Sequence, residues 1–218
     1  MSADFKERHK KKKTAFIRKR VLSFVEIIVI QINRLVLSLS VELDNFLDVL
    51  DISKSYSKQA FSQARQMLGY TAFIELNDSC VQGFYETFRY KKFRNKYLLL
   101  AVDGSLCQLP ESEEIASHFR RWKNQMPGKG IPMARISVLF DVLNQVVIDA
   151  SFSSNSIGEP SLLKKHFQKI SQLFQEKSTP YIYLMDRGYP SFEIIENIQK
   201  SKDFYVIRCK STYRKEVI

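Results

Sequence analysis

The chain has 218 residues, 44% of them hydrophobic, and a formal net charge of +11 at pH 7. This length accommodates one good-sized domain and a smaller one, with ample apolar side chains for a core. The three cysteines, Cys80, Cys107 and Cys209, lie far apart and form no CxxC pair. They argue against a disulfide framework and a zinc site and favour a reducing compartment.

The positive charge is concentrated in three segments. Residues 1–20 carry nine Lys and Arg against two acids, and residues 87–96 and 116–135 carry five each without an acid. A clustered positive field is typical of a protein with a polyanionic partner, because each neutralised phosphate releases counterions. A solvated basic surface explains the charge alone equally well, so both interpretations stay open.

The N-terminal part of the chain predicts a basic tail followed by helices. Residues 1–15 form a Lys-rich tail that we expect to be disordered in isolation. The apolar run at residues 21–30 is interrupted by Glu26 and has no small-residue cleavage site, so it indicates a buried helix rather than a signal peptide or a membrane span. Apolar residues at helical spacing over residues 16–50 predict two helices with a break near Ser40.

A third helix is predicted at residues 57–68, with Gly69 as its stop. Its polar side carries Lys58 and Arg65, which are candidate DNA contacts. Three short helices ending in a basic one match a DNA-reading module of the helix-turn-helix kind. A plain helical bundle fits the pattern at least as well, and both interpretations remain for a helical domain over residues 16–92.

Two apolar runs of this sequence end in an acid followed closely by glycine. One run leads to Asp103 and the other to Asp186. Ligands collect at the carboxyl ends of strands in open α/β sheets. If the two strands are parallel neighbours, about 4.8 Å apart, the two carboxylates lie together and suit Mg²⁺ or Mn²⁺. A single aspartate at a strand end more often caps a turn, so the pairing is what favours a metal site.

The residues between these two runs predict a basic irregular segment and a β-hairpin. Arg120 and Arg121 are candidate DNA contacts in the irregular segment, as is Lys129, whose GKG fragment lacks the spacing of a phosphate-binding P-loop. The runs at residues 134–142 and 145–152 are rich in Val and Ile and are separated by a short turn. They predict an antiparallel hairpin.

The order of the remaining elements predicts the fold class. They are a helix at residues 162–174, a strand at 181–185, a helix at 190–200 and a strand at 204–209. A right-handed crossover through the first helix places the Asp186 strand beside the Asp103 strand and parallel to it, with the hairpin on the far side. We therefore expect an α/β protein with an incomplete ribonuclease-H-like mixed sheet over residues 93–218, preceded by the helical domain.

The residues around the two acids are more specific than their spacing. The segments are AVDGS at residues 101–105, MDRGYPSFEII at residues 185–195, the hairpin ISVLFDVLNQVVIDA between them, and the helix SKQAFSQARQML. Together they resemble the insertion-sequence-four type of DDE transposases, over about residues 16–210. The phrase Asp-Arg-Gly-Tyr at the second acid is the most specific part.

The resemblance implies a role for each residue near the acids. Asp103 and Asp186 correspond to the first and second metal-binding acids of an enzyme that binds double-stranded DNA at transposon ends. Such enzymes use Mg²⁺ (or Mn²⁺) for strand cleavage and transfer. Arg187 and Tyr189 become candidate DNA contacts, against the alternatives of a salt bridge for the arginine and a packed ring for the tyrosine.

The sequence departs from this family at the third acid. Family members supply a Glu from a helix well downstream of the second Asp, in a Tyr, Arg, Glu, Lys signature. This sequence ends 32 residues after Asp186 without that signature, and Glu216 follows the last strand too closely. We therefore expect a truncated copy with impaired metal binding and catalysis.

Three interpretations of function remain. The first is a DNA transposase of which this chain is a truncated copy. It would act as a dimer with itself or with an intact transposase. The second is a catalytically inactive DNA-binding remnant that inhibits transposition. The third is a nuclease of the same fold that takes its third acid from within the chain, with Glu159 or Asp149 as candidates. All three place the protein in the bacterial cytoplasm, associated with the nucleoid and without membrane contact.

Overall fold

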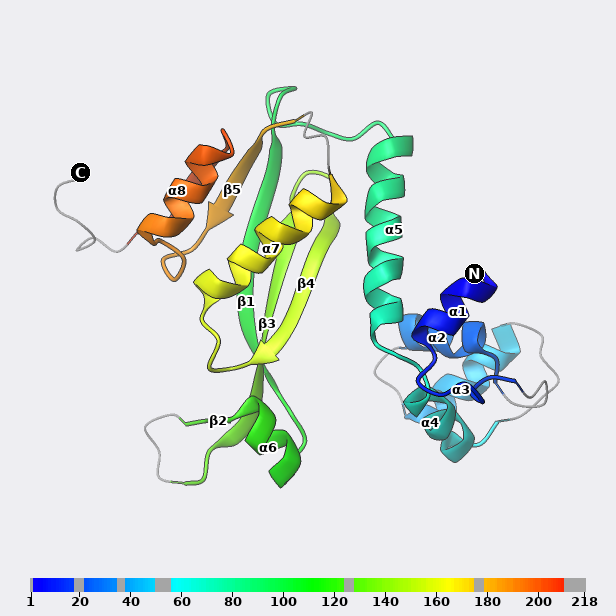
Figure 1. The fold of residues 1–218 in the computed structure, drawn as a ribbon. Helices are drawn as coiled ribbons and strands as arrows, with labels where there is room; N and C mark the ends of the chain where they lie inside the picture. The colour runs from blue at the N-terminus through cyan, green and yellow to red at the C-terminus, as the bar shows by residue number, and fades with distance from the viewer. Residues whose placement is uncertain are drawn as a thin grey trace. The chain divides into compact units, whose positions relative to one another are not determined.

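The structure is a computed structural model that describes residues 2–17, 22–34, 38–49, 56–123, 128–174 and 179–209. The chain separates into two compact units, Met1–Leu76 and Asn77–Ile218, and each is described by itself (Figure 1). Glu216 lies outside the described residues. Among the helices of the described part, none has both the length and the apolar character needed to cross a membrane.

The first unit is helical. Its helices are α1 (Ala3–His9), α2 (Phe24–Asn33), α3 (Leu39–Val49), α4 (Lys58–Gln66) and the first residues of α5 (Thr71–Thr87). Ser23 and Glu26 form a capping box at the start of α2, and the Ser57 side chain accepts the backbone N–H of Ala60 at the start of α4. The core of the unit consists mainly of buried side chains from these helices, among them Ile27, Ile28, Leu43 and Phe61.

The charged start of the chain folds as a helix, which differs from the disordered tail expected from composition. The Ser2 hydroxyl accepts the backbone N–H of Phe5 and caps α1. The Phe5 ring is buried, with its centroid 6.0 Å from that of Phe24. The buried His9 ring reaches Glu75 through Nε2 at 2.8 Å. The contacts of Phe5 with Phe24 and of His9 with Glu75 thus attach the lysine-rich segment to the rest of the first unit.

The second unit is an α/β domain with a mixed sheet. Its strands are β1 (Leu98–Gln108), β2 (Arg121–Trp122), β3 (Ile131–Asp141), β4 (Val146–Ser154), β5 (Tyr181–Met185) and β6 (Phe204–Ile207). The main order is β4-β3-β1-β5-β6, and the short β2 also pairs with β3. Strand β3 is antiparallel to β1 and β4, whereas β1, β5 and β6 are parallel. This ribonuclease-H-like arrangement confirms the predicted fold class, the hairpin and the parallel pairing.

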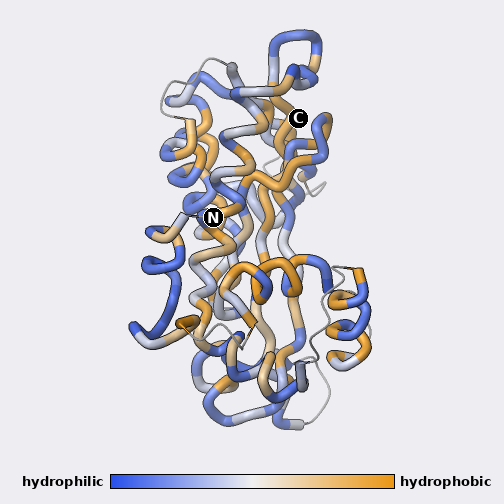
Figure 2. Tube along the Cα trace, turned by 90° about the vertical axis from the view of Figure 1, so that its right-hand side faces the viewer, coloured by the Kyte–Doolittle hydropathy of each residue, from blue (hydrophilic) through white to orange (hydrophobic). Residues whose placement is uncertain are grey.

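Two crossover helices cover one face of this sheet. Helix α7 (Glu159–Leu173) connects β4 to β5, and α8 (Phe192–Lys200) connects β5 to β6 (Figure 1). Leu163 of α7 and Ile194 of α8 are fully buried in the same cluster as Leu100 and Tyr183 of the sheet. In Figure 2 the tube is largely orange along the strands, as burial of their side chains requires. Helix α6 (Glu113–Phe119) belongs to the irregular segment between β1 and β2.

The element boundaries differ from the prediction in two informative places. Strand β1 does not end at Asp103, because β3 keeps pairing with it as far as Gln108. Helix α8 begins at Phe192 rather than Pro190, because the Ser191 hydroxyl accepts the backbone N–H of Ile194 and caps the helix. Asp103 is therefore held inside a paired strand rather than on a loop.

Truncation of Leu163 to alanine should destabilise the second unit by about 2–5 kcal/mol, because it opens a cavity between α7 and the sheet. Urea unfolding followed by circular dichroism measures the change. The exposed Lys165 on the same helix is the matched control, and Lys165→Ala should shift stability by less than about 0.5 kcal/mol. Equal effects of the two changes would contradict the described packing of α7.

Candidate functional site

The parallel pairing of β1 and β5 brings the two predicted acids to neighbouring positions. The last registered pair of these strands is Ala101 with Leu184. Continuing this register by two residues pairs Asp103 with Asp186. Side chains two residues apart on a strand share a face, and adjacent strands lie about 4.8 Å apart. Extended in this way, the register predicts that both aspartates lie side by side, on the sheet face opposite the buried Val102 and Met185.

Both carboxylates are open to solvent. The Asp103 side chain is exposed, and its Oδ1 accepts the backbone N–H of Gly104 at 2.8 Å. The Asp186 side chain is 50% exposed, and its Oδ1 lies 3.7 Å from Nε of Arg208, whose side chain is 73% exposed. Neither acid is buried against a cation, so both remain accessible to an external ligand.

The loop that follows Asp186 separates the two predicted DNA contacts next to it. Arg187 is exposed, as a phosphate contact would require. The backbone N–H of Tyr189 closes a turn onto the carbonyl of Asp186 at 3.1 Å, and the tyrosine ring is buried with 1% of its surface exposed. Burial, followed by the nearby charge of Glu159, raises the pKa of the Tyr189 phenol. Because the ring has no surface to offer DNA, the structure corrects that assignment to the packed-ring alternative.

A third carboxylate, Glu159, lies against Gly104 of β1 and Gly188 of the loop after Asp186. It is the first residue of α7, and its Oε1 accepts a hydrogen bond from Arg135 Nη1 at 3.0 Å. A Cβ atom built on Gly188 would overlap Glu159 Oε2, and one built on Gly104 would lie 3.5 Å from Oε1. The glycines that follow the two aspartates therefore make room for this side chain.

A buried polar chain lies behind the site. Ser137, which pairs with Gly104 across β1 and β3, has its Oγ 2.9 Å from His166 Nε2. The other ring nitrogen, His166 Nδ1, lies 2.6 Å from Asp149 Oδ2. A serine, histidine and aspartate in this order resemble a nucleophilic triad, but Ser137 and His166 are completely buried and no substrate can reach them. The chain instead joins β3, β4 and α7, and it engages the carboxylate of Asp149.

The basic residues predicted in the irregular segment are not equivalent. Arg120 and Lys129 are exposed. Arg121 is an ion-pair partner of Glu111, with a second contact from Nη1 to Oε2 at 3.0 Å. The hydrogen bond from Arg121 holds the pKa of Glu111 below its usual value. Arg121 therefore has its charge compensated locally, which makes it a weaker candidate for DNA than the other two.

The two basic residues predicted on the third helix belong to the first unit. Lys58 and Arg65 are both exposed on α4, whereas Phe61 and Ala64 of the same helix are buried. Their exposure is compatible with either interpretation of the helical unit.

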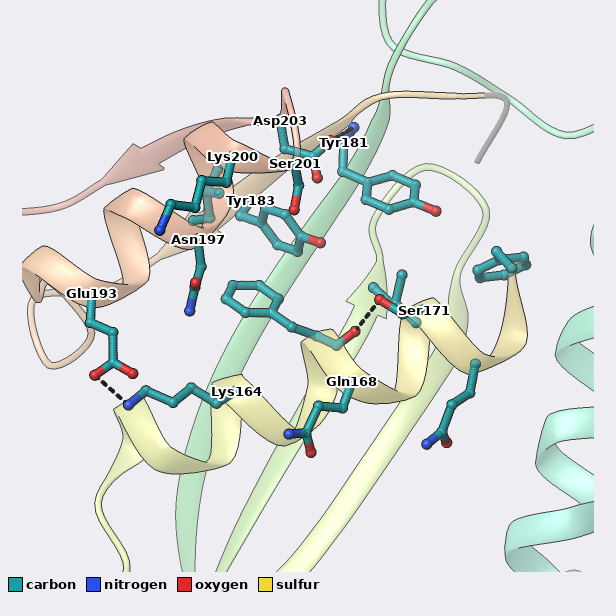
Figure 3. Close-up of a pocket in the computed structure, with 15 residues that line it drawn as sticks. Lys164, Gln168, Ser171, Tyr181, Tyr183, Glu193, Asn197, Lys200, Ser201 and Asp203 are labelled. Atoms are coloured by element: carbon teal, nitrogen blue, oxygen red, sulfur yellow. Dashed lines mark hydrogen bonds and ion pairs between the residues drawn. The ribbon is translucent and has the colours of Figure 1, made fainter. Parts of the chain in front are cut away.

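The groove between α7 and α8 lies apart from the aspartates. Its volume is about 770 Å³, and its lining includes Tyr181, Tyr183 and Asn197 but neither Asp103 nor Asp186 (Figure 3). Figure 3 shows an ion pair between Lys164 of α7 and Glu193 of α8, with Nζ and Oε2 2.5 Å apart. This groove lies on the side of the sheet covered by α7 and α8, and neither of the two predicted acids lines it.

A comparison with family models shows what this sheet belongs to. A model described as "Transposase DDE domain" matches residues 94–217, more than half of the chain. The chain belongs to this transposase family. A comparison with curated proteins gave no match.

Three solved transposase structures are similar to this family member. The piggyBac transposase synaptic complex with hairpin DNA is 14% identical, with a TM-score of 0.40, and the match covers 79% of this chain and 38% of that chain. The Mos1 paired-end complex with the left transposon end is 10% identical (TM-score 0.35; 80% and 59% covered). The Mos1 mariner paired-end complex with Mn is 13% identical (TM-score 0.35; 94% and 63% covered). The chain thus spans less than two thirds of the length of each.

The donor set of this transposase DDE domain suits a divalent cation in part. Asp103 and Asp186 supply hard carboxylate oxygens at neighbouring positions, which suit Mg²⁺ or Mn²⁺. Within the described ranges, no group of three or more His, Cys, Asp or Glu side chains has the arrangement of a metal site. Glu159 lies against Gly104 and Gly188, which follow the two aspartates in the sequence, but its carboxylate forms an ion pair with Arg135.

Replacement of Gly188 by alanine should cost about 1 kcal/mol, because the new methyl group overlaps Glu159 Oε2 and displaces a flexible side chain from Arg135. In a Glu159→Ala background the same change should cost nothing, and a double-mutant cycle in urea measures this coupling. Gly83 of α5 has no atom within 4 Å of an added Cβ, so Gly83→Ala is the control and should be neutral or stabilising by up to about 1 kcal/mol. An equal cost of Gly188→Ala in both backgrounds would contradict the contact.

Proposed function

We propose that this protein is a DNA transposase of the insertion-sequence-four type, which cleaves DNA at transposon ends and transfers the cut strand. The observation that carries the proposal is the parallel β1–β5 register in a member of the transposase DDE family. Extended by two residues beyond Ala101 and Leu184, this register would pair the exposed Asp103 with the exposed Asp186. The proposed substrate is chromosomal DNA, which implies a nucleoid-associated bacterial protein of the cytoplasm.

The two aspartates would act as metal ligands rather than as proton carriers. Two carboxylates at neighbouring strand positions repel each other, and a divalent cation between them removes that repulsion. When bound, Mg²⁺ or Mn²⁺ supplies charge stabilisation for the displacement at a phosphodiester and for the leaving oxygen. The chain's own contribution is rigidity, since Asp103 is fixed inside a strand that is hydrogen-bonded to β3.

Exposed cations near the acids would position the DNA. Arg187 directly follows Asp186 and is exposed. Arg120 and Lys129 add exposed positive charge to the same unit. Contacts of this kind bind phosphates without reading sequence, so we expect binding that weakens steeply with salt. Lys58 and Arg65 of α4 would add contacts from the first unit, as a helix-turn-helix module does. A dimer on paired transposon ends is part of the proposal.

A second candidate function is a DNA-binding protein without catalysis, which would inhibit transposition by occupying DNA ends or pairing with an active enzyme. It is favoured by the ion pair of Glu159 with Arg135, which engages the acid best placed to act as a third ligand. The competing possibility is a nuclease of the same fold, in which Glu159 would leave Arg135 and become the third metal ligand. The other acid considered for that role, Asp149, lies with Oδ2 at 2.6 Å from Nδ1 of the buried His166.

Replacement of Asp103 or Asp186 by asparagine should abolish Mn²⁺ binding and reduce Mg²⁺-dependent plasmid nicking on the order of 100-fold or more, because each change removes a ligand charge at constant shape. DNA affinity should be unchanged, since the aspartates are not cations. Titration calorimetry with Mn²⁺, a nicking assay and fluorescence anisotropy with labelled DNA measure the three properties.

The exposed Glu196 on α8 supplies the matched control, and Glu196→Gln should leave all three properties unchanged. A wild-type chain that binds DNA but neither binds Mn²⁺ nor nicks DNA would favour the non-catalytic candidate. Parallel loss of DNA binding and nicking in Asp103→Asn would contradict the ligand assignment.

A further inference from the structure

The segment between α5 and β1 is a second basic surface, at the other end of β1 from the candidate site. Residues 89–97, RYKKFRNKY, contain five Lys and Arg, three aromatic residues and no acid. We call this segment the basic hairpin. We propose that the basic hairpin binds an unpaired segment of a DNA strand, through its phosphates and by stacking of bases on exposed rings.

The backbone of the basic hairpin is a closed turn. The N–H of Phe93 donates to the carbonyl of Tyr97 at 2.7 Å, and the N–H groups of Lys96 and Tyr97 donate to the carbonyl of Phe93, each at 3.0 Å. Arg94 and Asn95 at its tip have φ angles of 50° and 58°. Positive φ at both central residues is the pattern of a type I′ turn.

Arg94 is an unusual residue for its conformation. A left-handed backbone costs an ordinary residue about 1–2 kcal/mol relative to glycine. Asparagine tolerates this conformation, as Asn95 does here, whereas arginine rarely adopts it. Sparsely populated backbone conformations of this kind collect where a side chain serves a binding partner. The tip therefore retains a cation where stability alone favours glycine.

The base of the hairpin is fixed to the sheet. The Asn144 side chain accepts the N–H of Lys91 at 2.7 Å and donates to the carbonyl of Lys91 at 3.0 Å. It also donates to Asp141 Oδ2 at 2.7 Å, and the Tyr85 hydroxyl donates to the same oxygen at 2.5 Å. Asp141 is completely buried, and the groups that donate to its carboxylate here are neutral. This acid therefore does not neutralise the lysines of the hairpin. The segment is thus presented in one conformation, which lowers the entropy cost of binding.

The cations of the hairpin are held by rings rather than by acids. Three of them stand over aromatic faces, 5.0 to 5.5 Å from the ring centroids: Lys92 over Tyr90, Arg94 over Phe93, and Lys96 over Tyr97. Across the part of the chain that the structure describes, no carboxylate forms an ion pair with residues 89–97. The positive charge is therefore ordered but not neutralised, and it remains available to a polyanion.

The shape of the surface favours a single strand. A concave region of about 870 Å³ is lined by residues 88–92 together with Asn95 and Leu143. Phe88 is 62% exposed and Phe93 is 40% exposed. A cationic groove with exposed rings is the combination that holds unpaired nucleic acid, because phosphates pair with the cations and bases stack on the rings. A duplex offers phosphates but no free base faces, and a flat membrane does not fill a groove.

The basic hairpin is distinct from the candidate catalytic site. Five residue steps of β1 separate Leu98 from Asp103, which corresponds to about 17 Å of strand. In Figure 1 the segment leading into β1 stands at the top end of the sheet, and it is blue at the top of Figure 2.

The test compares two double variants that lose the same charge. Lys92→Gln/Lys96→Gln should weaken binding of a fluorescein-labelled 20-nucleotide single strand to the full chain at least tenfold at low salt. It should also reduce the slope of log affinity against log salt by about 1.4, the value for two phosphate contacts on a single strand. Lys165→Gln/Lys200→Gln, with both lysines on the helices of the covered face, is the control and should change affinity less than twofold.

Two single variants separate stacking and folding from charge. Phe93→Leu should weaken single-strand binding more than binding of the matching duplex, because it removes a ring but no cation. Arg94→Gly should raise the melting temperature while weakening single-strand binding, since it relieves the left-handed backbone and removes a charge. Weaker binding in a more stable protein cannot result from misfolding.

Three results would overturn the proposal. The control pair could weaken single-strand binding as much as the hairpin pair does, or the hairpin variants could bind the single strand as the wild type does. The hairpin variants could also lose binding to phosphatidylserine vesicles while they still bind DNA, which would assign the surface to a membrane. The proposal goes beyond the proposed transposase function and fails separately from it. Asp103→Asn should leave single-strand affinity unchanged, so a chain without nicking activity can still confirm the hairpin, and a nicking chain can still refute it.

Discussion

The pairing of β1 with β5 is the constraint on which the rest of the second unit depends. These two parallel strands come from segments about eighty residues apart, and their register, continued by two residues, would bring Asp103 and Asp186 to neighbouring positions on the sheet. The pairing is held from one side by α7 and α8, whose buried leucine and isoleucine side chains pack against Leu100 and Tyr183. The hydrophobic face thus fixes the geometry of the strands whose ends carry the two proposed metal ligands.

The loops beside the two aspartates are coordinated by the start of α7. Glu159 occupies the space left by Gly104 and Gly188, so a single carboxylate contacts the surroundings of both acids. Beneath it, the contacts from Ser137 through His166 to Asp149 tie two strands to the same helix. Buried polar groups that satisfy one another in this way specify one arrangement of the backbone more strictly than apolar packing does. A helix whose sequence signals only a crossover therefore also organises the site.

Local patterns in the sequence were sufficient for the fold, because strands and helices here follow simple periodicity. The run YIYLM predicted β5 to the residue, and the Val- and Ile-rich runs predicted the hairpin. Long-range contacts were beyond such patterns. Nothing near Tyr189 indicates that its ring is buried, and nothing near Glu159 indicates that it meets two glycines from other segments. The helix at residues 3–9 was missed for a related reason, since its partner Glu75 lies more than sixty residues away.

The alternation of β1 has a consequence for how this protein can vary. Leu98, Leu100 and Val102 face the helices, and Asp103 faces away only because an odd number of steps separates it from them. One residue inserted or deleted in this stretch would rotate the carboxylate into the apolar layer beneath α7 and bring a hydrophobic side chain to the open face. The stretch should therefore accept changes of side chain but not of length, and insertions in relatives should be confined to the loops.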